Sequence, residues 1–590
     1  MKHTFATTIL ITTLLLARPA ALHAAEPPAS VPLSPRQVWE DYDPNKGDFK
    51  EVILSAETKD GIYKRESYIS AYVLGEDIRI YCKYSVKEGL TNAPGLLNVH
   101  GWMGAPGIEK EYVTDGWAVM TYDYCGKTGD RRQFTRYPDP LRHCNMDSKV
   151  GITVRSATAD RKSITDPKQT SDYVWYAMSR RLLSYLEQQK EVDKTRLGAR
   201  GYSYGGTLMW QLATDPRVKA VVAYFGIGYT EYYRNKRVWL YNNPYAEPEK
   251  TAGEEIYLAS IAPEAYVPHI TAATLFLNGS NDHHGVFERG LESFKKFKPG
   301  VPWSFAIQPR GHHNTEHIGQ DCKLWLEKHV LNKVLNKDHF WPAHPESEIK
   351  LNAEGVPELI VTPSSPKKVK SVEMYYALKN PAYFSRAWRD VEVVHKGHSW
   401  VGEMPVANVD DYVFSFANIT YDNTVVVTTD FNAAIPSRLG NATATDKTSD
   451  RYSGAGGIGA WSNVVEVEGV GRIKGFRCAD NQAGTGSELM SNPQWKCPSN
   501  AQLGFKFYCT EPQTLVVTAD GYDYEVEITA SDHWQEMLLP ASKFISRATQ
   551  KRMGSWKTTT AVHFKPKSDS DITKVLFAQF NWVAPSNRPN

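Results

Sequence analysis

The sequence of 590 residues has almost no excess of charge of either sign. Lys and Arg together number 68 and Asp and Glu 66, so the net charge is +2, and no long run of one sign occurs. A dedicated nucleic-acid-binding protein needs a basic face that attracts the phosphate backbone. That class is therefore excluded, and a neutral or weakly charged substrate fits the composition better.

Long hydrophobic runs are also missing beyond the first residues. Lys2 and His3 precede the apolar run 5–17, and small residues follow up to Ala24 and Ala25, which is the order of a secretory signal peptide over residues 1–25. No later stretch reaches the roughly 18 consecutive apolar residues that cross a bilayer. We expect a secreted or periplasmic protein without a membrane span.

Cysteine is scarce, and its number, seven, is odd. Export permits disulfide bonds, so local pairs are predicted between Cys125 and Cys144 and between two of Cys478, Cys497 and Cys509. The alternative, free buried thiols, stays open.

Strand-like and helical patterns alternate through residues 26–340. Apolar strand-like runs occur at Gly95–Val99, Trp117–Tyr122, Leu197–Gly201, Ala220–Phe225 and Thr274–Leu277, and a helix is predicted over Asp172–Gln189. This alternation is typical of a mainly parallel sheet with helices on both faces. The chain is thus predicted to begin with an α/β domain.

Short β-rich runs separated by turn residues replace this pattern after Trp341. They predict a β-sandwich over residues 341–436, and the polar, glycine-rich stretch 437–459 is typical of a linker. Strand-like runs resume over residues 460–590 and predict a second β-module.

A serine flanked by glycines follows one of the predicted strands. The run Gly-Tyr-Ser-Tyr-Gly-Gly places Ser203 between Gly201 and Gly205, ahead of a helical segment. Only small residues fit two positions before and after a serine on so sharp a strand-to-helix turn, so this G-x-S-x-G pattern indicates a nucleophile elbow.

A serine nucleophile needs a base and an orienting carboxylate, in the chain order Ser, Asp, His for this sheet type. Asp282 lies in the loop after one predicted strand, and His312 follows Gly311 after the next. His313 and His317 are rivals for the base, and a surface or metal-binding histidine cluster is the alternative interpretation. We favour Ser203, Asp282 and His312 as a catalytic triad, and expect no metal.

The turn His100-Gly101-Trp102-Met103-Gly104 follows another predicted strand. Such H-G-x-x-G turns aim a backbone N–H at a developing oxyanion, so the predicted donors are the N–H groups of Trp102 and Tyr204. The run Gly126-Lys127-Thr128 lacks the earlier glycine of a phosphate-binding loop, and no cofactor is predicted.

An aromatic cluster follows the predicted strand that ends at Phe225. Tyr229, Tyr233 and Trp239 are predicted to form a wall that stacks on sugar rings, since flat apolar faces favour such contacts. The alternative is that these rings pack a cap onto the domain.

With these motifs, residues 35–335 resemble the α/β-hydrolase superfamily. The elbow looks most like those of prolyl-oligopeptidase-type, dienelactone-hydrolase-like and acetyl xylan esterase-like members. Glucuronoyl esterases carry Arg after the serine, where this chain has Tyr204, which weakens a uronate-ester interpretation. The last module, with Trp534, Phe544 and Trp556, is similar to jelly-roll carbohydrate-binding modules, although these rings also suit a sandwich core.

The resemblance implies an α/β-hydrolase fold followed by two β-sandwich domains, and two functions. The first is a carbohydrate esterase that removes acyl groups from a polysaccharide or oligosaccharide through an acyl-enzyme. The second is a dipeptidyl or X-Pro-type serine peptidase, which needs an acidic anchor; Glu231, Glu254 and Glu255 are candidates that equally suit solvated helix positions.

Overall fold

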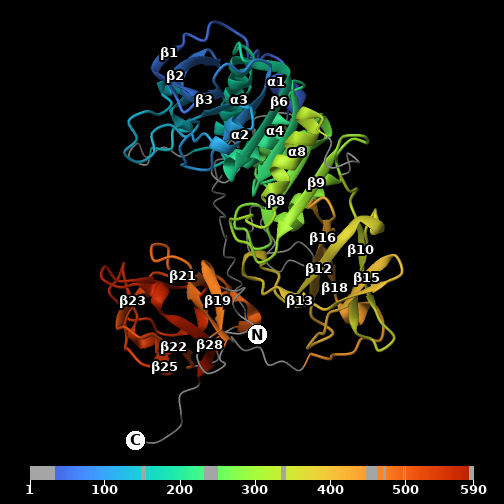
Figure 1. The fold of residues 1–590 in the computed structure, drawn as a ribbon, viewed down its shortest axis with the longest axis vertical. Helices are drawn as coiled ribbons and strands as arrows, with labels where there is room; N and C mark the ends of the chain where they lie inside the picture. Colours follow the sequence, from blue (N-terminus) through green and yellow to red (C-terminus); the bar gives the residue numbers. More distant parts are fainter. Residues whose placement is uncertain are drawn as a thin grey trace, which may run out of the picture.

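A computed structural model gives the fold of this chain in three parts. In Figure 1 the N-terminal part lies at the top, the second part at lower right and the C-terminal part at lower left. It describes residues 33–147, 154–157, 160–230, 250–333, 341–446, 461–468, 474–495, 497 and 500–583. The predicted signal peptide, most of the predicted linker, and Tyr233 and Trp239 lie outside these ranges.

The N-terminal part is built on a nine-stranded sheet with the order β1-β2-β3-β5-β4-β6-β7-β8-β9. Its strands are β1 (Val52–Lys59), β2 (Ile62–Val73), β3 (Glu76–Lys87), β4 (Ala93–Val99), β5 (Ala118–Tyr122), β6 (Val192–Tyr202), β7 (Val218–Tyr224), β8 (Ala273–Gly279) and β9 (Trp303–Gln308). The six strands β5-β4-β6-β7-β8-β9 run parallel to one another. The pairs β1–β2, β2–β3 and β3–β5 are antiparallel. The predicted parallel sheet is confirmed, and the antiparallel extension is an addition that the sequence analysis missed.

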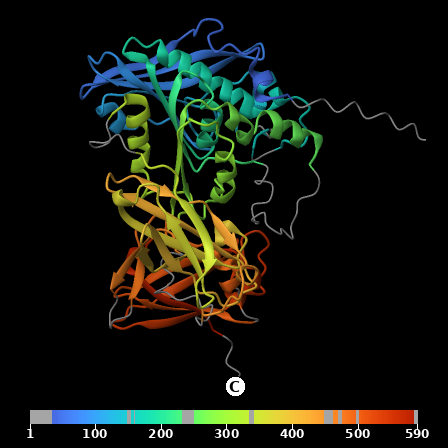
Figure 2. The same cartoon turned by 90° about the vertical axis from the view of Figure 1, so that its right-hand side faces the viewer.

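Helices cover both faces of this sheet, as the side view of Figure 2 shows. They are α1 (Pro35–Trp39), α2 (Lys110–Thr114), α3 (Ser171–Glu187), α4 (Tyr204–Leu212), α5 (Ala252–Ser260), α6 (Pro263–Tyr266), α7 (Phe287–Phe294) and α8 (Gln320–Leu331). The buried side chains of α3 and α4 share one hydrophobic core, and those of α2 and α8 share a second core on the opposite face. This is the three-layer arrangement of an α/β domain.

The second part is a β-sandwich of two antiparallel sheets. One has the order β10-β11-β15-β14 and the other β13-β12-β16-β17, with β18 also paired to β16. The bounds are β10 (Glu346–Leu351), β11 (Pro357–Thr362), β12 (Val369–Leu378), β13 (Arg389–Val391), β14 (Val393–Lys396), β15 (Ser399–Glu403), β16 (Val413–Tyr421), β17 (Val426–Thr428) and β18 (Asn432–Ala434). Apolar side chains from both sheets meet in a common core.

The sandwich covers one edge of the N-terminal sheet. The backbone N–H of Ile307 in β9 donates to Thr428 Oγ1 at 2.9 Å, and its carbonyl accepts from Asn418 Nδ2 at 2.9 Å. Trp388 and Phe416 of the sandwich also belong to the core that contains α3 and α4. The two parts therefore share both a polar and an apolar interface.

The third part is another antiparallel β-sandwich, with sheet orders β19-β20-β28-β22-β25 and β21-β27-β23-β24-β26. The bounds are β19 (Val464–Glu468), β20 (Lys474–Cys478), β21 (Thr485–Ser487), β22 (Gln502–Tyr508), β23 (Gln513–Ala519), β24 (Tyr522–Ile528), β25 (Gln535–Leu539), β26 (Ile545–Ser546), β27 (Val562–Pro566) and β28 (Leu576–Val583). Phe544 and Trp556 are buried in its core, so these two rings stabilise the module and do not face solvent.

The predicted disulfides are wrong for this structure. All seven cysteines are free and buried, including Cys125 and Cys144 in the N-terminal core. Proximity in sequence did not bring the sulfurs into bonding geometry. Burial raises the pKa of the Cys497 thiol to about 11.

None of the helices within the described ranges combines the length and apolarity needed to span a lipid bilayer.

Candidate active site

Ser203 sits at the point where β6 turns into α4. Its backbone has φ 54° and ψ −119°, a positive φ that is strained for a residue with a side chain. A Cβ at Gly205 would lie 2.4 Å from the Val99 carbonyl oxygen, and one at Gly201 would lie 2.2 Å from the Gly205 carbonyl oxygen. Both positions flanking the serine thus have room only for glycine.

Hydrogen bonds fix the backbone of this turn. The Ser203 N–H donates to the Tyr224 carbonyl at 2.9 Å, and the Ser203 carbonyl accepts from the Thr207 N–H at 3.0 Å. The Ser203 side chain remains partly exposed. Strain at an exposed serine, held by surrounding hydrogen bonds, is typical of an activated nucleophile.

The predicted oxyanion turn lies directly beside the serine. A Cβ at Gly101 would be 3.1 Å from Ser203 Cβ, so the two backbones are in close contact. Trp102 follows in this turn, and Tyr204 begins α4, where the first N–H groups of a helix lack partners within the helix. The structure brings the segments of both predicted donors to Ser203.

Asp282 lies in the loop after β8 and is completely buried. Its Oδ1 accepts from the N–H groups of His284 and Gly285, both at 2.6 Å. Its Oδ2 is 2.6 Å from Nδ1 of His313. Two backbone donors hold Oδ1 and leave Oδ2 as a strong acceptor aimed at an imidazole, which is how a carboxylate fixes a histidine tautomer.

The partner of Asp282 is His313, so the predicted pairing with His312 is corrected. The Asn281 N–H donates to the Gly311 carbonyl at 2.8 Å, and Gly279 packs so tightly that an added Cβ would be 2.2 Å from the His312 carbonyl oxygen. The backbone at 311–312 is thereby fixed against the end of β8, and the following residue carries the imidazole to Asp282.

His312 and His317 lie elsewhere. His317 is exposed, and its N–H donates to Gln308 Oε1 at 2.9 Å. Burial lowers the pKa of His312, opposed by the nearby carboxylates of Glu488 and Asp282. Glu488 belongs to the C-terminal module, so His312 lies at the boundary between that module and the N-terminal domain.

Aromatic rings surround the His313 imidazole. Its centroid is 4.2 Å from that of Phe225 and 4.6 Å from that of His283. Because Phe225 directly follows Tyr224, whose carbonyl holds the Ser203 N–H, a single strand end positions both the serine and the base. His284 is buried, and burial lowers its pKa to about 4, so it is neutral at pH 7.

Below Ser203 a buried carboxylate holds the next residue in place. The Tyr204 hydroxyl donates to Asp172 Oδ1 at 2.5 Å, and the Tyr257 hydroxyl donates to Asp172 Oδ2 at 2.7 Å. Burial raises the pKa of Asp172 to about 6, opposed by these hydrogen bonds. The sequence offered no signal for this network, since its members come from three separate helices.

The loop after β5 packs against the oxyanion turn. Arg131 donates to Asp123 Oδ1 at 3.2 Å, and Thr128 Oγ1 donates to the Met103 carbonyl at 3.3 Å. Arg131 thereby stabilises the loop next to that turn.

Two groups of side chains have the residue types of metal ligands. His100, Asp123 and Cys125 form one, and Asp282, His283 and His313 the other; within each group the ligand atoms lie within 4.8 Å of one another. Asp123 already accepts a hydrogen bond from Arg131, and Asp282 from His313, so hydrogen bonds occupy the carboxylates of both groups.

Of the predicted aromatic wall, only Tyr229 is described. It is partly buried, packs against Val286 and Tyr383, and its ring lies 5.6 Å from Lys296 Nζ. It therefore contacts the sandwich as well as its own domain.

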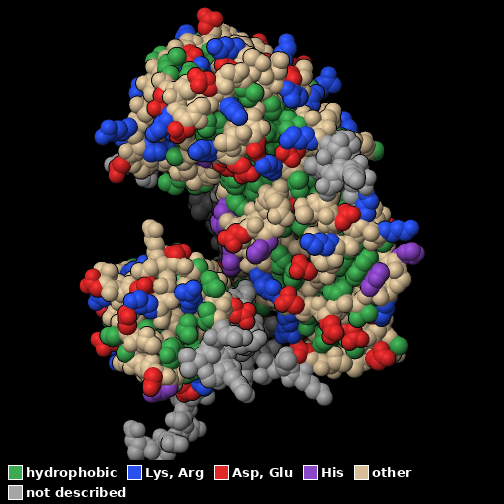
Figure 3. Space-filling view, viewed as in Figure 1, with side chains coloured by type: hydrophobic (Ala, Val, Ile, Leu, Met, Phe, Trp, Pro, Cys, Tyr) green, Lys and Arg blue, Asp and Glu red, His purple; other side chains and the backbone are tan. Residues whose placement is uncertain are grey.

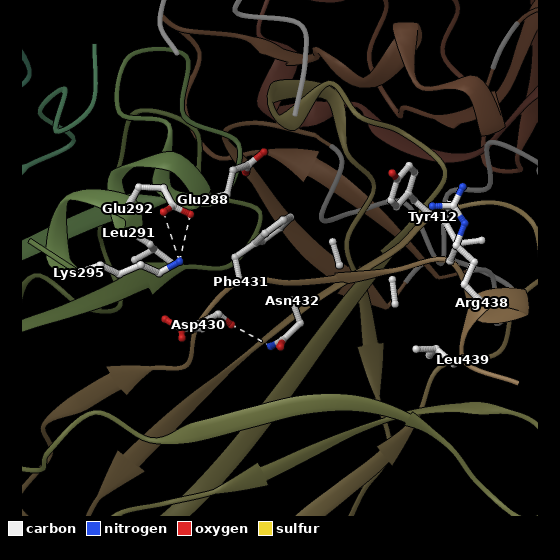
Figure 4. Close-up of a pocket in the computed structure, with 13 residues that line it drawn as sticks. Glu288, Leu291, Glu292, Lys295, Tyr412, Asp430, Phe431, Asn432, Arg438 and Leu439 are labelled. Atoms are coloured by element: carbon white, nitrogen blue, oxygen red, sulfur yellow. Dashed lines mark hydrogen bonds and ion pairs between the residues drawn. The ribbon is translucent and has the colours of Figure 1, made fainter. Parts of the chain in front are cut away.

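A separate cavity of about 520 Å³ lies between α7 and the β-sandwich (Figure 4). Lys295 Nζ there is 3.2 Å from a carboxylate oxygen of Glu292. Neither Ser203 nor the predicted oxyanion turn lines this cavity.

A known protein family matches the part of the chain that contains these residues. The model of the prolyl oligopeptidase family (Peptidase_S9) matches residues 181–330, a range that includes Ser203, Asp282 and His313. The N-terminal domain is an α/β-hydrolase domain. Its sheet order, its strained serine turn and this match agree.

Relatives of the hydrolase domain include both peptidases and esterases. Dipeptidyl-peptidase 5 of Porphyromonas gingivalis is 30% identical over 155 residues, covering 24% of this chain; the match spans only 22% of that protein. Acetyl xylan esterases from Thermoanaerobacterium sp. and Paenibacillus sp. R4 are each 17% identical and match 49% of this chain and 90% and 91% of theirs, with TM-scores of 0.37 and 0.39. Pyrococcus horikoshii acylaminoacyl peptidase is 17% identical over 48% of this chain and 49% of its own, with a TM-score of 0.30.

Proposed function

We propose that this serine hydrolase removes acyl groups from a polysaccharide or oligosaccharide, with Ser203, His313 and Asp282 as its catalytic triad. The observation that carries the chemistry is the 2.6 Å contact between Asp282 Oδ2 and His313 Nδ1. The His313 ring packs against Phe225, and the residue before it, Tyr224, accepts the N–H of Ser203, whose φ is positive. With signal-peptide export, the substrate would be met outside the cytoplasm.

The reaction follows from these positions. Ser203 Oγ attacks the ester carbonyl while His313 Nε2 takes the hydroxyl proton, and Asp282 stabilises the imidazolium through Nδ1–H. The N–H groups of Trp102 and Tyr204 donate to the oxyanion. His313 then protonates the departing sugar oxygen, which leaves as the alcohol. In the second half of the reaction His313 deprotonates a water that attacks the acyl-enzyme, and it returns that proton to Ser203 Oγ as the acid is released.

An exposed tryptophan beside the nucleophile supports a sugar substrate. The Trp102 side chain is 36% exposed and is held by a T-shaped contact with Trp175 at 6.0 Å and by the Tyr204 ring at 5.0 Å. A rigid, exposed indole face stacks on the apolar face of a pyranose. Figure 3 shows a hollow between the hydrolase domain and the C-terminal module, with histidine side chains on its wall.

The alternative is a dipeptidyl-type peptidase, which the prolyl oligopeptidase match and the relative from Porphyromonas gingivalis favour. Such an enzyme needs an acidic anchor for the substrate amino group. Glu254 accepts from the Thr251 N–H at 3.0 Å as a helix cap, Glu255 is exposed, and Glu231 lies outside the described residues. Of the described candidates, Glu254 is thus engaged in capping α5.

The test is hydrolysis of a panel of acetylated, methyl-esterified and feruloylated glycans beside dipeptide amides. We expect acid release from acylated glycans by the wild-type enzyme, and its loss in Ser203→Ala. Amide cleavage without glycan de-esterification would establish the peptidase instead.

A second measurement examines the tryptophan. Trp102→Ala keeps the backbone N–H but removes the stacking face, so KM for an acetylated xylo-oligosaccharide should rise roughly tenfold, the equivalent of about 1.4 kcal/mol. An aryl acetate, too small to need the ring, should show a much smaller change. Equal losses on both substrates would contradict the stacking role.

A further inference from the structure

The catalytic loop and the C-terminal module are fastened to the same short segment of the β-sandwich. Asn281, next to Asp282, donates through Nδ2 to the carbonyls of Tyr383 at 3.1 Å and Arg386 at 2.9 Å. From the other side, Asn492 Nδ2 donates to the Ser385 carbonyl at 3.1 Å. Both asparagines are almost fully buried. Segment 383–386 therefore fixes the module at a defined position beside the catalytic loop.

Glu488 lies four residues before Asn492, at the start of the short helix η12 (Leu489–Ser491). Its Oε1 is 3.0 Å from Nε2 of His563, and the two side chains are 45% and 37% exposed. The hydrogen bond from His563 lowers the pKa of Glu488, and His312 and His283 of the hydrolase domain lower it further. The Glu488 carboxylate of the module thus interacts electrostatically with the imidazoles of His312 and His283 in the catalytic loops.

A glycine sets the position of the His563 ring. Gly486 in β21 pairs directly with His563 in β27, and a Cβ at Gly486 would lie 2.1 Å from the imidazole Nδ1. The ring therefore occupies the space that a side chain would fill on the neighbouring strand. That packing directs Nε2 toward Glu488.

From this arrangement we infer that the C-terminal module completes the active site: Glu488 and His563, together with His283 and His312, form a subsite for sugar hydroxyl groups on the alcohol side of the scissile ester. This inference rests on the proposed esterase function. An ionised carboxylate alone would select a cation, but a carboxylate among imidazoles offers acceptors and donors together, which suits a neutral polyol. The partial exposure of the pair leaves it accessible to a ligand.

The module therefore acts as a wall of the site and not as a remote anchor. A remote anchor would raise affinity for the polymer through tethering alone and would leave short oligosaccharides unaffected. A wall contacts the sugars next to the acylated one, so even short acylated oligosaccharides should depend on it.

The experiment compares Glu488→Gln with the wild-type enzyme on an acetylated xylo-oligosaccharide and on 4-nitrophenyl acetate. We expect the ratio of the two kcat/KM values to fall roughly tenfold, through KM for the oligosaccharide. Gly486→Ala, which displaces His563, should lower the same ratio. Asp532→Asn is the matched control: Asp532 also pairs with a histidine of this module, His533 at 2.9 Å, but the two side chains are 100% and 76% exposed.

Three outcomes separate the possibilities. An unchanged ratio in Glu488→Gln, with the wild-type enzyme still active on the oligosaccharide, overturns the subsite and leaves the esterase function standing. Equal losses on both substrates with a lower melting temperature would show a purely structural role and also overturn it. A wild-type enzyme that cleaves only peptides refutes the esterase function, and the glycan subsite falls with it.

Discussion

Glu288 of α7 and Arg386 of the β-sandwich form a bidentate ion pair, with oxygen-to-nitrogen distances of 3.0 and 3.1 Å and both side chains completely buried. The guanidinium also donates to the carbonyls of Asn380 and Pro381. The pair joins the hydrolase domain to the sandwich at the segment that receives Asn281. Its integrity should therefore affect both stability and the catalytic loop.

Arg386→Ala should destabilise the protein strongly, because it leaves the Glu288 carboxylate buried without its cation. Removal of one partner of a buried pair costs about 3 to 5 kcal/mol in free energy of unfolding. Urea denaturation measures the change. Lys379→Ala is the control: Lys379 pairs with Asp411 at 3.6 Å, but its side chain is 54% exposed, and it should cost less than about 1 kcal/mol. Similar losses of unfolding free energy in both variants would show that the buried pair stabilises the fold no more than an exposed pair does.

His313→Ala should reduce kcat by roughly four orders of magnitude, about as much as Ser203→Ala, because triad members act as a unit. His312→Ala should leave hydrolysis of an aryl acetate within roughly tenfold of the wild-type rate, since its imidazole does not contact Asp282. Steady-state kinetics on both variants decides the matter. A severe loss in His312→Ala beside a mild one in His313→Ala would refute the assignment of the base.

Asp172 predicts a specific dependence of stability on pH. Burial raises its pKa to about 6 in the folded protein, against roughly 3.9 for an unfolded chain. The folded state therefore binds this proton more tightly, and the stabilisation is fully present below about pH 4 and lost as pH rises through 6. A shift of about two units corresponds to about 3 kcal/mol.

The measurement is the free energy of unfolding of wild type minus that of Asp172→Asn, which cannot titrate. This difference should fall by about 2 to 3 kcal/mol between pH 4 and pH 7. Tyr257→Phe removes one of the hydrogen bonds that lower the pKa of Asp172. In that variant the loss of stability with rising pH should therefore extend to higher pH. A difference independent of pH would contradict the burial of an ionisable Asp172.

All seven cysteines should react as thiols, and only after unfolding, because each is buried. Titration with a thiol reagent under native conditions should give almost no reaction, and titration in denaturant should give all seven thiols. Intact mass measured with and without a reductant should be the same. A count lower by two thiols in denaturant would contradict this structure and support the predicted disulfide between Cys125 and Cys144.

The elbow could be predicted from sequence because its reason is local. Gly201 and Gly205 are required by contacts within one turn and with the adjacent strand, and those contacts recur wherever this turn forms. The choice between His312 and His313 could not be made in this way. It depends on how Asn281 and Gly279 of another loop fix the backbone at Gly311.

The proposed subsite at Glu488 depends even less on local sequence patterns. Its carboxylate is remote in sequence from His312, and only the docking of three domains on segment 383–386 brings the two together. The antiparallel strands β1, β2 and β3 were missed for a simpler reason. Their turns contain positive-φ residues such as Asp60 and Leu74, which the alternation of strands and helices does not reveal.

The two edges of the nine-stranded sheet differ in a way that limits self-assembly. At β9, the bonds from Ile307 to Thr428 and Asn418 occupy the groups that another strand would need. At β1, all eight residues are exposed, with Val52 and Ile53 more than half accessible. Strand addition at an edge requires unpaired backbone groups. Among the described residues of this sheet, the edge at β1 is therefore the one open to strand addition, and pairing of two β1 strands would end at a closed pair.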